Sequence, residues 1–328
     1  MNANVNWLGG FDPARQDAFH RSLTLGNAGT VLFQSAISKT LQMLTNRNLG
    51  IQSTLPRRPW TGDGWYSQRR TAATTGAAWV DDTDTAVNSE GGYTQVKFGF
   101  KTLLGKINVT RRLIDQGRTW GDVLAGELIG KTDDFMAVLE TTSVTGNATA
   151  NAKEIDGLLT LIGAVSGQTI ANTTASGGDS LYLDKLDETI QAVKGHSNKA
   201  SMRIYGNRRG GRLVNNALQA QQRFVNMVDI EGGFTVESYG GIPIVESTGI
   251  PDVLTYVAGT PLITVFTGGA TTALIVVNTS YVFYAELNPM TVMPLANTTS
   301  QSSDIDLFHD VVLCLDNTLG GAILAGLA

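Results

Sequence analysis

A chain of 328 residues can form one large or two medium-sized domains, but only 16% of its residues are charged, against about 25% in ordinary soluble domains. No apolar run reaches the roughly 18 residues that a membrane-spanning helix needs, and the N-terminus lacks the basic start and apolar middle of a signal peptide. The single cysteine, Cys314, excludes an internal disulfide. We therefore expect a cytoplasmic protein with no membrane partner, whose weakly charged surface is largely buried against neighbouring molecules.

The net charge of −5 is distributed unevenly along the chain. Residues 1–70 hold eight Arg or Lys and three acidic residues, a net charge of +5. Residues 71–328 hold sixteen Arg or Lys and twenty-six acidic residues, a net charge of −10. A basic N-terminal segment on an acidic body favours self-association or contact with a polyanion. A mild bias without functional meaning explains the same numbers equally well.

The first 54 residues are predicted to form an extended arm. Within it, apolar side chains recur at nearly helical spacing at Val31, Phe33, Ile37, Leu41 and Leu44. This spacing predicts one amphipathic helix over residues 30–45.

The next segment, residues 55–94, is a long loop rich in tryptophan. Three of the five Trp in the chain lie here beside two Tyr: Trp60, Trp65, Trp79, Tyr66 and Tyr93. No helical or strand periodicity buries these rings locally, and structureless segments of this length are usually functional or disordered. Tryptophan and arginine are enriched in protein–protein interfaces, whereas disordered segments are poor in aromatic residues. We interpret the loop as an arm that packs on another molecule; the alternative is a flexible surface insertion.

Two regular elements follow the loop. Residues 96–101 alternate apolar and polar side chains, which predicts a half-buried strand, the return leg of a large hairpin. Residues 119–146 are predicted to form a helix of roughly 40 Å, a spine that other elements cross, with Gly146 at its end. Its inward positions repeat on one face: Leu124, Leu128, Phe135, Leu139 and Thr142.

Residues 151–284 alternate helices and strands, which indicates a mixed α/β domain. A Gly-, Thr- and Ser-rich loop is followed by a helix that Ser180 caps and Gly195 ends. The run MRIYGN predicts a strand, Asn207 begins the next helix, and further strands are predicted in FTVESYGGIPIVES and ALIVV. The tail, residues 282–328, is strand-like again and is expected to return to the sheet beside the long helix.

The histidines give no sign of a metal or catalytic site. His20, His196 and His309 lie far apart, and none has a second His or Cys at metal-ligand spacing. His309 lies at the end of a predicted strand, where a surface or partly buried position is expected.

Two further motifs favour structural readings over binding ones. The run GNRRGG lacks the glycine and lysine pattern of a phosphate-binding loop, so an ordinary helix start is the better interpretation. Asp81, Asp82 and Asp84 lack the glycine and distal Glu of a calcium-binding loop. A solvated acidic stretch, or a partner for arginine on another subunit, is preferred for them.

The order of these segments resembles the major capsid proteins of tailed double-stranded-DNA bacteriophages, whose shell fold is shared with encapsulins. In that family an arm and an extended hairpin loop precede a spine helix, a Gly-rich turn and a G-L-L-like segment, here TGNATANAKEIDGLLTLI. A helix, a G-x-P-V-like strand and a nearby proline follow, here GGIPIVES and Ile250-Pro251. The resemblance covers nearly the whole chain.

The resemblance implies an α+β fold of the tailed-phage major capsid type, in five consecutive parts. These are an N-terminal arm (1–54), an extended hairpin loop (55–95), the first part of a peripheral domain with the spine helix 119–146 (96–150), an axial domain (151–284) and the return strands of the peripheral domain (285–328).

It also implies a structural, non-enzymatic protein without cofactors. Copies of the chain, as hexamers and pentamers, would form the icosahedral shell around a double-stranded DNA genome, assembled in the bacterial host cytoplasm and retained in the virion. Many members carry a long cleaved scaffolding region, but this chain begins with a short arm. A separate scaffolding protein or none is therefore expected, with portal and decoration proteins as further candidate partners.

Residues 55–95 contain no lysine, so the lysine-based cross-linking from this loop that some members use is not expected. The alternatives are an encapsulin-type compartment and, from another class, an α/β enzyme without a recognisable site.

Two groups of site residues are expected. The first is an intersubunit interface of loop residues with acidic partners on the spine helix, where Arg69 and Asp134 are the specific pair: Trp60, Trp65, Trp79, Arg57, Arg58, Arg69, Arg70, Asp133 and Asp134. The second is a set of basic arm residues that face packaged DNA or a scaffold on the inner surface, through sequence-independent contacts: Arg15, Arg21, Lys39 and Arg47.

Overall fold

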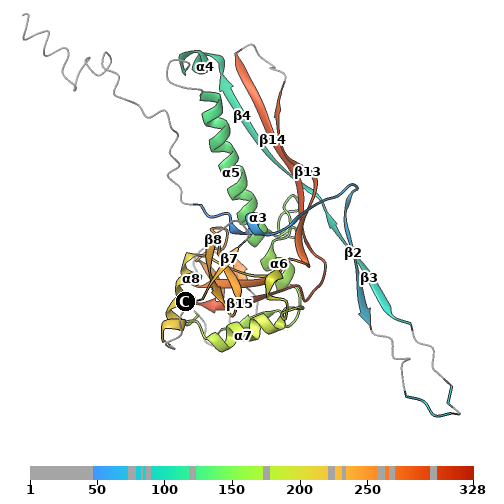
Figure 1. Ribbon diagram of the computed structural model, residues 1–328. Helices are drawn as coiled ribbons and strands as arrows, with labels where there is room; N and C mark the ends of the chain where they lie inside the picture. The colour runs from blue at the N-terminus through green and yellow to red at the C-terminus, as the bar shows by residue number, and fades with distance from the viewer. Residues whose placement is uncertain are drawn as a thin grey trace, which may run out of the picture.

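The molecule is an elongated limb joined to a rounded body, with a long hairpin that projects from their junction (Figure 1). The computed structural model describes residues 47–72, 79–82, 84–85, 90–117, 123–172, 178–220, 226–230, 234–256, 263–265, 270–295 and 301–328. The helix predicted over residues 30–45 lies outside these ranges. In the described part of the chain, no helix is long and apolar enough to cross a membrane.

The limb consists of a four-stranded sheet and the helix that covers it. The strand order is β1 (Arg57–Pro59), β13 (Val282–Pro294), β14 (Ser302–Leu315) and β4 (Lys101–Thr110). Buried and exposed side chains alternate along β4, as expected for a strand with one covered face: Ile107 and Val109 are buried and their neighbours are exposed. The buried face meets Phe135 of α5 (Val123–Thr145), and the short helix α4 (Arg111–Gly117) follows β4 at the far end.

The spine helix predicted from the sequence corresponds to α5. Its 23 described residues give a rod of about 35 Å. Leu124 and Leu128 pack on the same cluster as Phe135, and Leu139 reaches the cluster at the junction with the body. The helix ends beside Gly146, where an added Cβ would lie only 2.3 Å from the carbonyl oxygen of Ile155. That backbone approach requires glycine and fixes the place where the chain leaves the spine.

The body is built on a seven-stranded sheet with the order β5-β15-β12-β6-β9-β8-β7. These strands are β5 (Thr169–Ala171), β15 (Gly321–Leu327), β12 (Thr272–Asn278), β6 (Met202–Gly206), β9 (Ile242–Glu246), β8 (Phe234–Tyr239) and β7 (Asn226–Ile230). The central strand β12 is buried along its whole length. Its Ile275 faces the junction with the limb, and its Leu274 faces the helices on the other side. Burial on both faces explains the continuous apolar run ALIVV.

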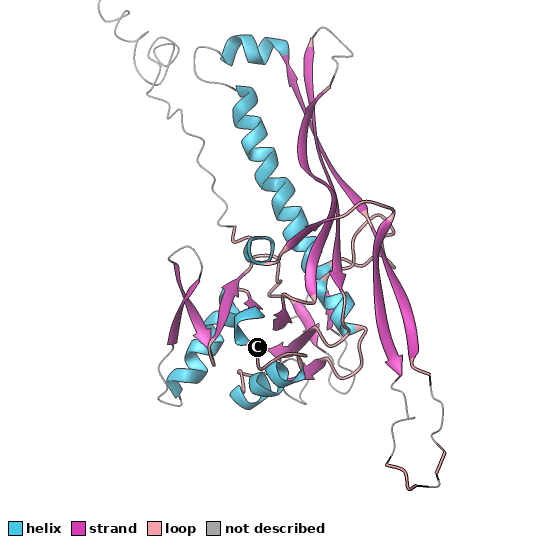
Figure 2. Ribbon diagram, turned by 45° about the vertical axis from the view of Figure 1, so that its right-hand side comes forward, coloured by secondary structure: helices cyan, strands magenta, loops and turns pink. Residues whose placement is uncertain are grey.

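Helices α6 (Leu158–Gly163), α7 (Leu183–Ala192) and α8 (Arg208–Ala220) complete the body (Figure 2). Asn207 begins α8 as predicted, because its Oδ1 accepts a hydrogen bond of 2.7 Å from the backbone N–H of Gly210. The cap predicted for α7 is wrong: Tyr182 stands at that position, and no side chain caps the helix. Ser180 instead donates its backbone N–H to Asp179.

The remaining elements are short. They are the helix α3 (Gly50–Thr54), the 3₁₀ turn η1 (Lys199–Ser201), and the two-stranded sheet of β10 (Leu254–Tyr256) and β11 (Ile263–Val265).

The C-terminal segment divides between the two sheets. β13 and β14 lie in the limb, as the expected return strands should, but β15 lies in the body between β5 and β12. The prediction that residues 285–328 all return to the limb is therefore wrong for β15. The reason is compositional: the β15 run GAILAGL is buried throughout and suits a strand covered on both faces.

The aromatic loop is largely a hairpin. β2 (Gly64–Ala72) pairs antiparallel with β3 (Gly92–Gly99), in a register that joins Gly64 to Gly99. β3 is the return leg that the alternation after the loop predicts. The expectation of no strand structure in residues 55–94 is wrong for β1 and β2. β2 pairs with β3 and turns Trp65, Ser67 and Arg69 toward the limb, and this covered face is not apparent from the sequence because two of its three side chains are polar.

Candidate assembly interface

The base of the hairpin is fixed to the limb of its own chain by aromatic rings. Trp65 lies edge-on between Trp60 and Phe283, with ring centroids 4.9 and 5.0 Å away. Its indole N–H donates to Asp316 Oδ1 at 2.8 Å, so the polar part of the ring is also satisfied. These contacts correct the premise that the loop rings have no partner within their own chain: Trp65 and Trp60 anchor the hairpin.

The loop arginines also bind their own chain. Arg57 donates to Glu286 at 2.7 Å, and the Arg58 guanidinium lies 3.8 Å from the ring centroid of Phe283. Arg69 donates to the backbone oxygens of Leu315 and Asp316. Burial lowers the pKa of Arg69, and the nearby Asp316 charge opposes that effect. Arg70 is exposed on β2, beside Tyr93 of β3.

The two acids of the spine helix hold the end of the N-terminal arm. Arg47 donates to both Asp133 and Asp134, the latter at 2.9 Å. Arg69, the expected partner of Asp134, donates within this chain to the backbone of Leu315 and Asp316, and its pairing with Asp134 of another subunit stays a prediction. The other predicted inner-surface residues, Arg15, Arg21 and Lys39, lie outside the described residues.

A buried carboxylate at the junction was missed by the sequence reasoning. Glu140 of α5 is 1% exposed and accepts hydrogen bonds from the backbone N–H groups of Ile51 and Gln52 and from the hydroxyl of Ser247. It thus ties the spine to α3 and to the end of β9. The sequence signal for this role is the position of Glu140 beside Leu139, on the buried side of the predicted helix.

His309 also belongs to a buried polar group and not to the surface, which corrects the expectation. It is 1% exposed, and its Nε2 lies 3.0 Å from Glu286, which Arg57 also binds. Burial raises the pKa of Glu286, but the His309 hydrogen bond and the Arg57 charge outweigh burial and hold the pKa below its usual value. The group joins β1, β13 and β14 at the root of the hairpin.

The far part of the hairpin has different surroundings. Trp79 is fully exposed, Val80 is 55% exposed and Tyr93 is 75% exposed. Tyr93 lies on β3 and Trp79 lies between β2 and β3, and large exposed rings on a hairpin whose base is fixed are suited to burial against another molecule. Among the described residues, no group of His, Cys, Asp or Glu could hold a metal ion.

The model of the phage capsid family matches residues 29–290, and the chain belongs to that family. It is a major capsid protein, a structural subunit of a capsid shell, and its fold is the one that phage capsids and encapsulins share. No curated protein sequence matches the chain.

Several solved structures share this fold at low sequence identity. The capsid protein of an empty GTA particle has a TM-score of 0.69 at 15% identity, with 94% of this chain and 99% of that chain covered. The holo-SrpI encapsulin of Synechococcus elongatus has a TM-score of 0.66 at 12% identity, with 92% of this chain and 94% of that chain covered. The structure from Mycobacterium phage Bobi has a TM-score of 0.62 at 14% identity, with 90% of this chain and 95% of that chain covered.

Proposed function

We propose that copies of this chain assemble head-to-tail into hexamers and pentamers of a closed icosahedral shell that encloses the double-stranded DNA of a tailed bacteriophage. The exposed aromatic tip of the hairpin carries this proposal. The hairpin of β2 and β3 projects from the rest of the chain (Figure 1). Its residues Trp79, Val80 and Tyr93 are exposed on their own chain, so a neighbouring copy would be needed to bury them. Shell subunits need large, obligate interfaces of about 2,000 Å² or more.

The remaining partners are part of the same proposal. A separate scaffolding protein, a portal and decoration proteins would act with the shell, which would form in the bacterial cytoplasm and remain in the virion. The protein would have no enzymatic activity. Packaged DNA would be contacted through its phosphates only, without base recognition.

Trp79→Ala combined with Tyr93→Ala tests the proposal. Both side chains are largely exposed in the single chain, so the unassembled variant should keep the circular dichroism and melting temperature of the wild type. Its yield of closed particles, counted by electron microscopy after size-exclusion chromatography, should fall severely. Leu319→Ala, a 42% exposed apolar residue of the body, is the control and should assemble normally. Unchanged yield in the double variant would exclude the clamp.

An encapsulin-type compartment is the second candidate, because the SrpI encapsulin covers nearly the whole chain at a similar TM-score. The contents of the particles separate the two. A capsid from infected cells protects genome-length DNA from nuclease, whereas a compartment holds a cargo protein and no genome.

A further inference from the structure

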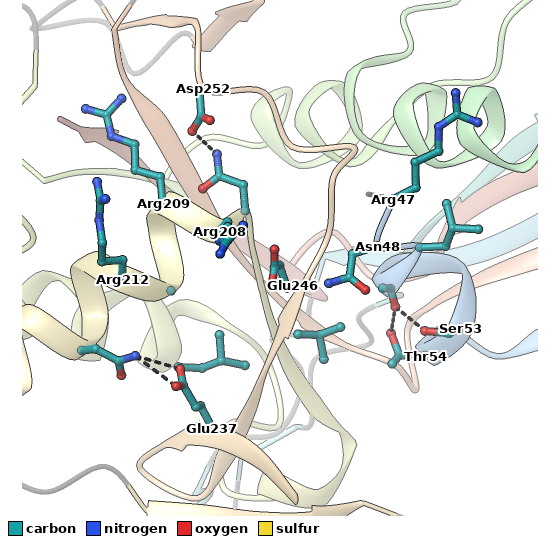
Figure 3. A pocket seen from close by; sticks show the side chains of 17 residues that line it. Arg47, Asn48, Ser53, Thr54, Arg208, Arg209, Arg212, Glu237, Glu246 and Asp252 are labelled. Atoms are coloured by element: carbon teal, nitrogen blue, oxygen red, sulfur yellow. Dashed lines mark hydrogen bonds between the residues drawn. The ribbon is translucent and has the colours of Figure 1, made fainter. Parts of the chain in front are cut away.

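An open hollow of ≈ 1500 Å³ lies where the first turns of α8 approach the chain around α3 (Figure 3). One wall carries three arginines of α8, Arg208, Arg209 and Arg212, whose spacing of three and four residues places them on one side of the helix. Arg47 and Asn48 lie on the opposite side of the hollow (Figure 3).

Among the residues that the structure describes, the α8 arginines have no carboxylate partner, whereas Arg47 has two. Arg209 donates to the backbone oxygen of Ala270 at 2.8 Å, and Arg208 and Arg212 are exposed; within the described ranges, none of the three forms an ion pair. Two of the three lining acids bind asparagines, since Asn215 donates to Glu237 and Asn207 donates to Asp252. Three guanidinium groups that meet no carboxylate in the described part of the chain, beside the positive end of a helix, favour an anionic occupant.

The lining also limits what that occupant can be. Glu237, Glu246 and Asp252 share the hollow with the arginines, and they would repel a polyphosphate backbone. Gly211 leaves open space, because nothing lies within 4 Å of an added Cβ, so a polypeptide could approach α8 closely. A peptide segment with a few carboxylates fits this mixed lining better than DNA does.

We propose that the hollow receives the acidic tip of the hairpin of a neighbouring copy, Asp81, Asp82 and Asp84. All three acids are exposed, and none forms an ion pair among the described residues. Asp84 donates its backbone N–H to the carbonyl of Asp81 at 3.0 Å, which folds the acids into one turn beside Trp79. Arginine presents a planar pair of donors to such carboxylates.

The geometry explains why a second copy must supply the tip. The hairpin and α8 lie on opposite sides of the molecule in both views (Figures 1 and 2), so the chain cannot fill its own hollow. A head-to-tail ring brings opposite sides of adjacent subunits together. This inference rests on the proposed shell assembly and specifies where the acidic end of the hairpin binds.

Charge reversal tests the inference. Arg208→Glu with Arg212→Glu removes two exposed side chains and places acids near the N-terminus of α8, where they favour the helix, so the subunit should fold normally. Its particle yield at physiological salt should fall about tenfold or more. Asp81→Arg with Asp82→Arg in the same chain should restore much of that yield. Arg112→Glu with Lys153→Glu, two other exposed residues, changes the net charge equally and is the control.

Cysteine cross-linking gives a second readout that does not depend on yield. Asp82→Cys with Arg212→Cys should produce a ladder of covalent oligomers on non-reducing gels of oxidised particles, whereas Asp82→Cys with Arg112→Cys should not. Absence of the ladder, or equal ladders in both, would overturn the docking. Normal particles of the Arg208 and Arg212 variant that fail to retain DNA would overturn it in favour of phosphate binding. If the wild type itself formed no particles, the proposed function would fail instead.

Discussion

At the scale of single residues, Glu140 is the most consequential side chain of the junction. Replacing it by Ala leaves three buried donors without an acceptor, each costing about 1–3 kcal/mol. We expect Glu140→Ala to lower the unfolding free energy of the unassembled subunit by about 3 kcal/mol or more, measured by urea denaturation. Glu127→Ala, an exposed Glu on the same helix, should change it little. Equal effects would show that Glu140 is not a structural acceptor.

Glu286 should give the subunit a measurable pH dependence. The pKa of Glu286 in the folded protein lies below its usual value of 4.5. Its contribution to the free energy of unfolding is therefore complete above pH 4.5 and is lost as the pH falls through the lower, folded pKa. Glu286→Gln should therefore show a shallower loss of urea stability between pH 5 and pH 3, roughly the range in which a carboxylate titrates. Glu188→Gln, on the exposed side of α7, is the control and should retain the wild-type slope.

At the scale of elements, the hairpin combines an anchored base with a free tip. Trp65→Ala removes the ring between Trp60 and Phe283 and the hydrogen bond to Asp316, and we expect a loss of about 3 kcal/mol. Trypsin should then cleave faster after Arg69 and Arg70 in the unassembled subunit. Trp79→Ala should change neither stability nor cleavage, since that ring is fully exposed. Similar protease sensitivity in both variants would mean that Trp65 is no anchor.

At the scale of the whole molecule, the assembled shell should decide the position of the basic arm. We propose that Arg15, Arg21 and Lys39 face the interior, where phosphate neutralisation gives weak, salt-sensitive contacts. Arg47, which is fixed to the spine, marks where the arm leaves the body. Limited trypsin digestion of closed, DNA-filled particles should therefore leave Arg15 and Arg21 intact until the shell is opened. Rapid cleavage in closed particles would place the arm outside.

The sequence by itself determined the class of fold, the spine helix within a few residues, and most strands of the body. These features depend on local periodicity: Leu128 and Phe135 repeat along one helix face, and the run ALIVV needs burial on both sides wherever it lies. The order of the segments also sufficed for the family, because chain order is a property of the sequence alone.

Only the tertiary structure decided which partners the side chains have. Trp65, Arg69, Glu140 and His309 meet residues more than 20 positions away, and no local pattern encodes which of several acceptors they reach. β15 illustrates the same limit, because its apolar sequence would suit either sheet. Pairing with both β5 and β12 places it in the seven-stranded sheet of the body. Periodicity fixes which face of an element is buried, whereas the identity of the partner depends on how the chain closes in three dimensions.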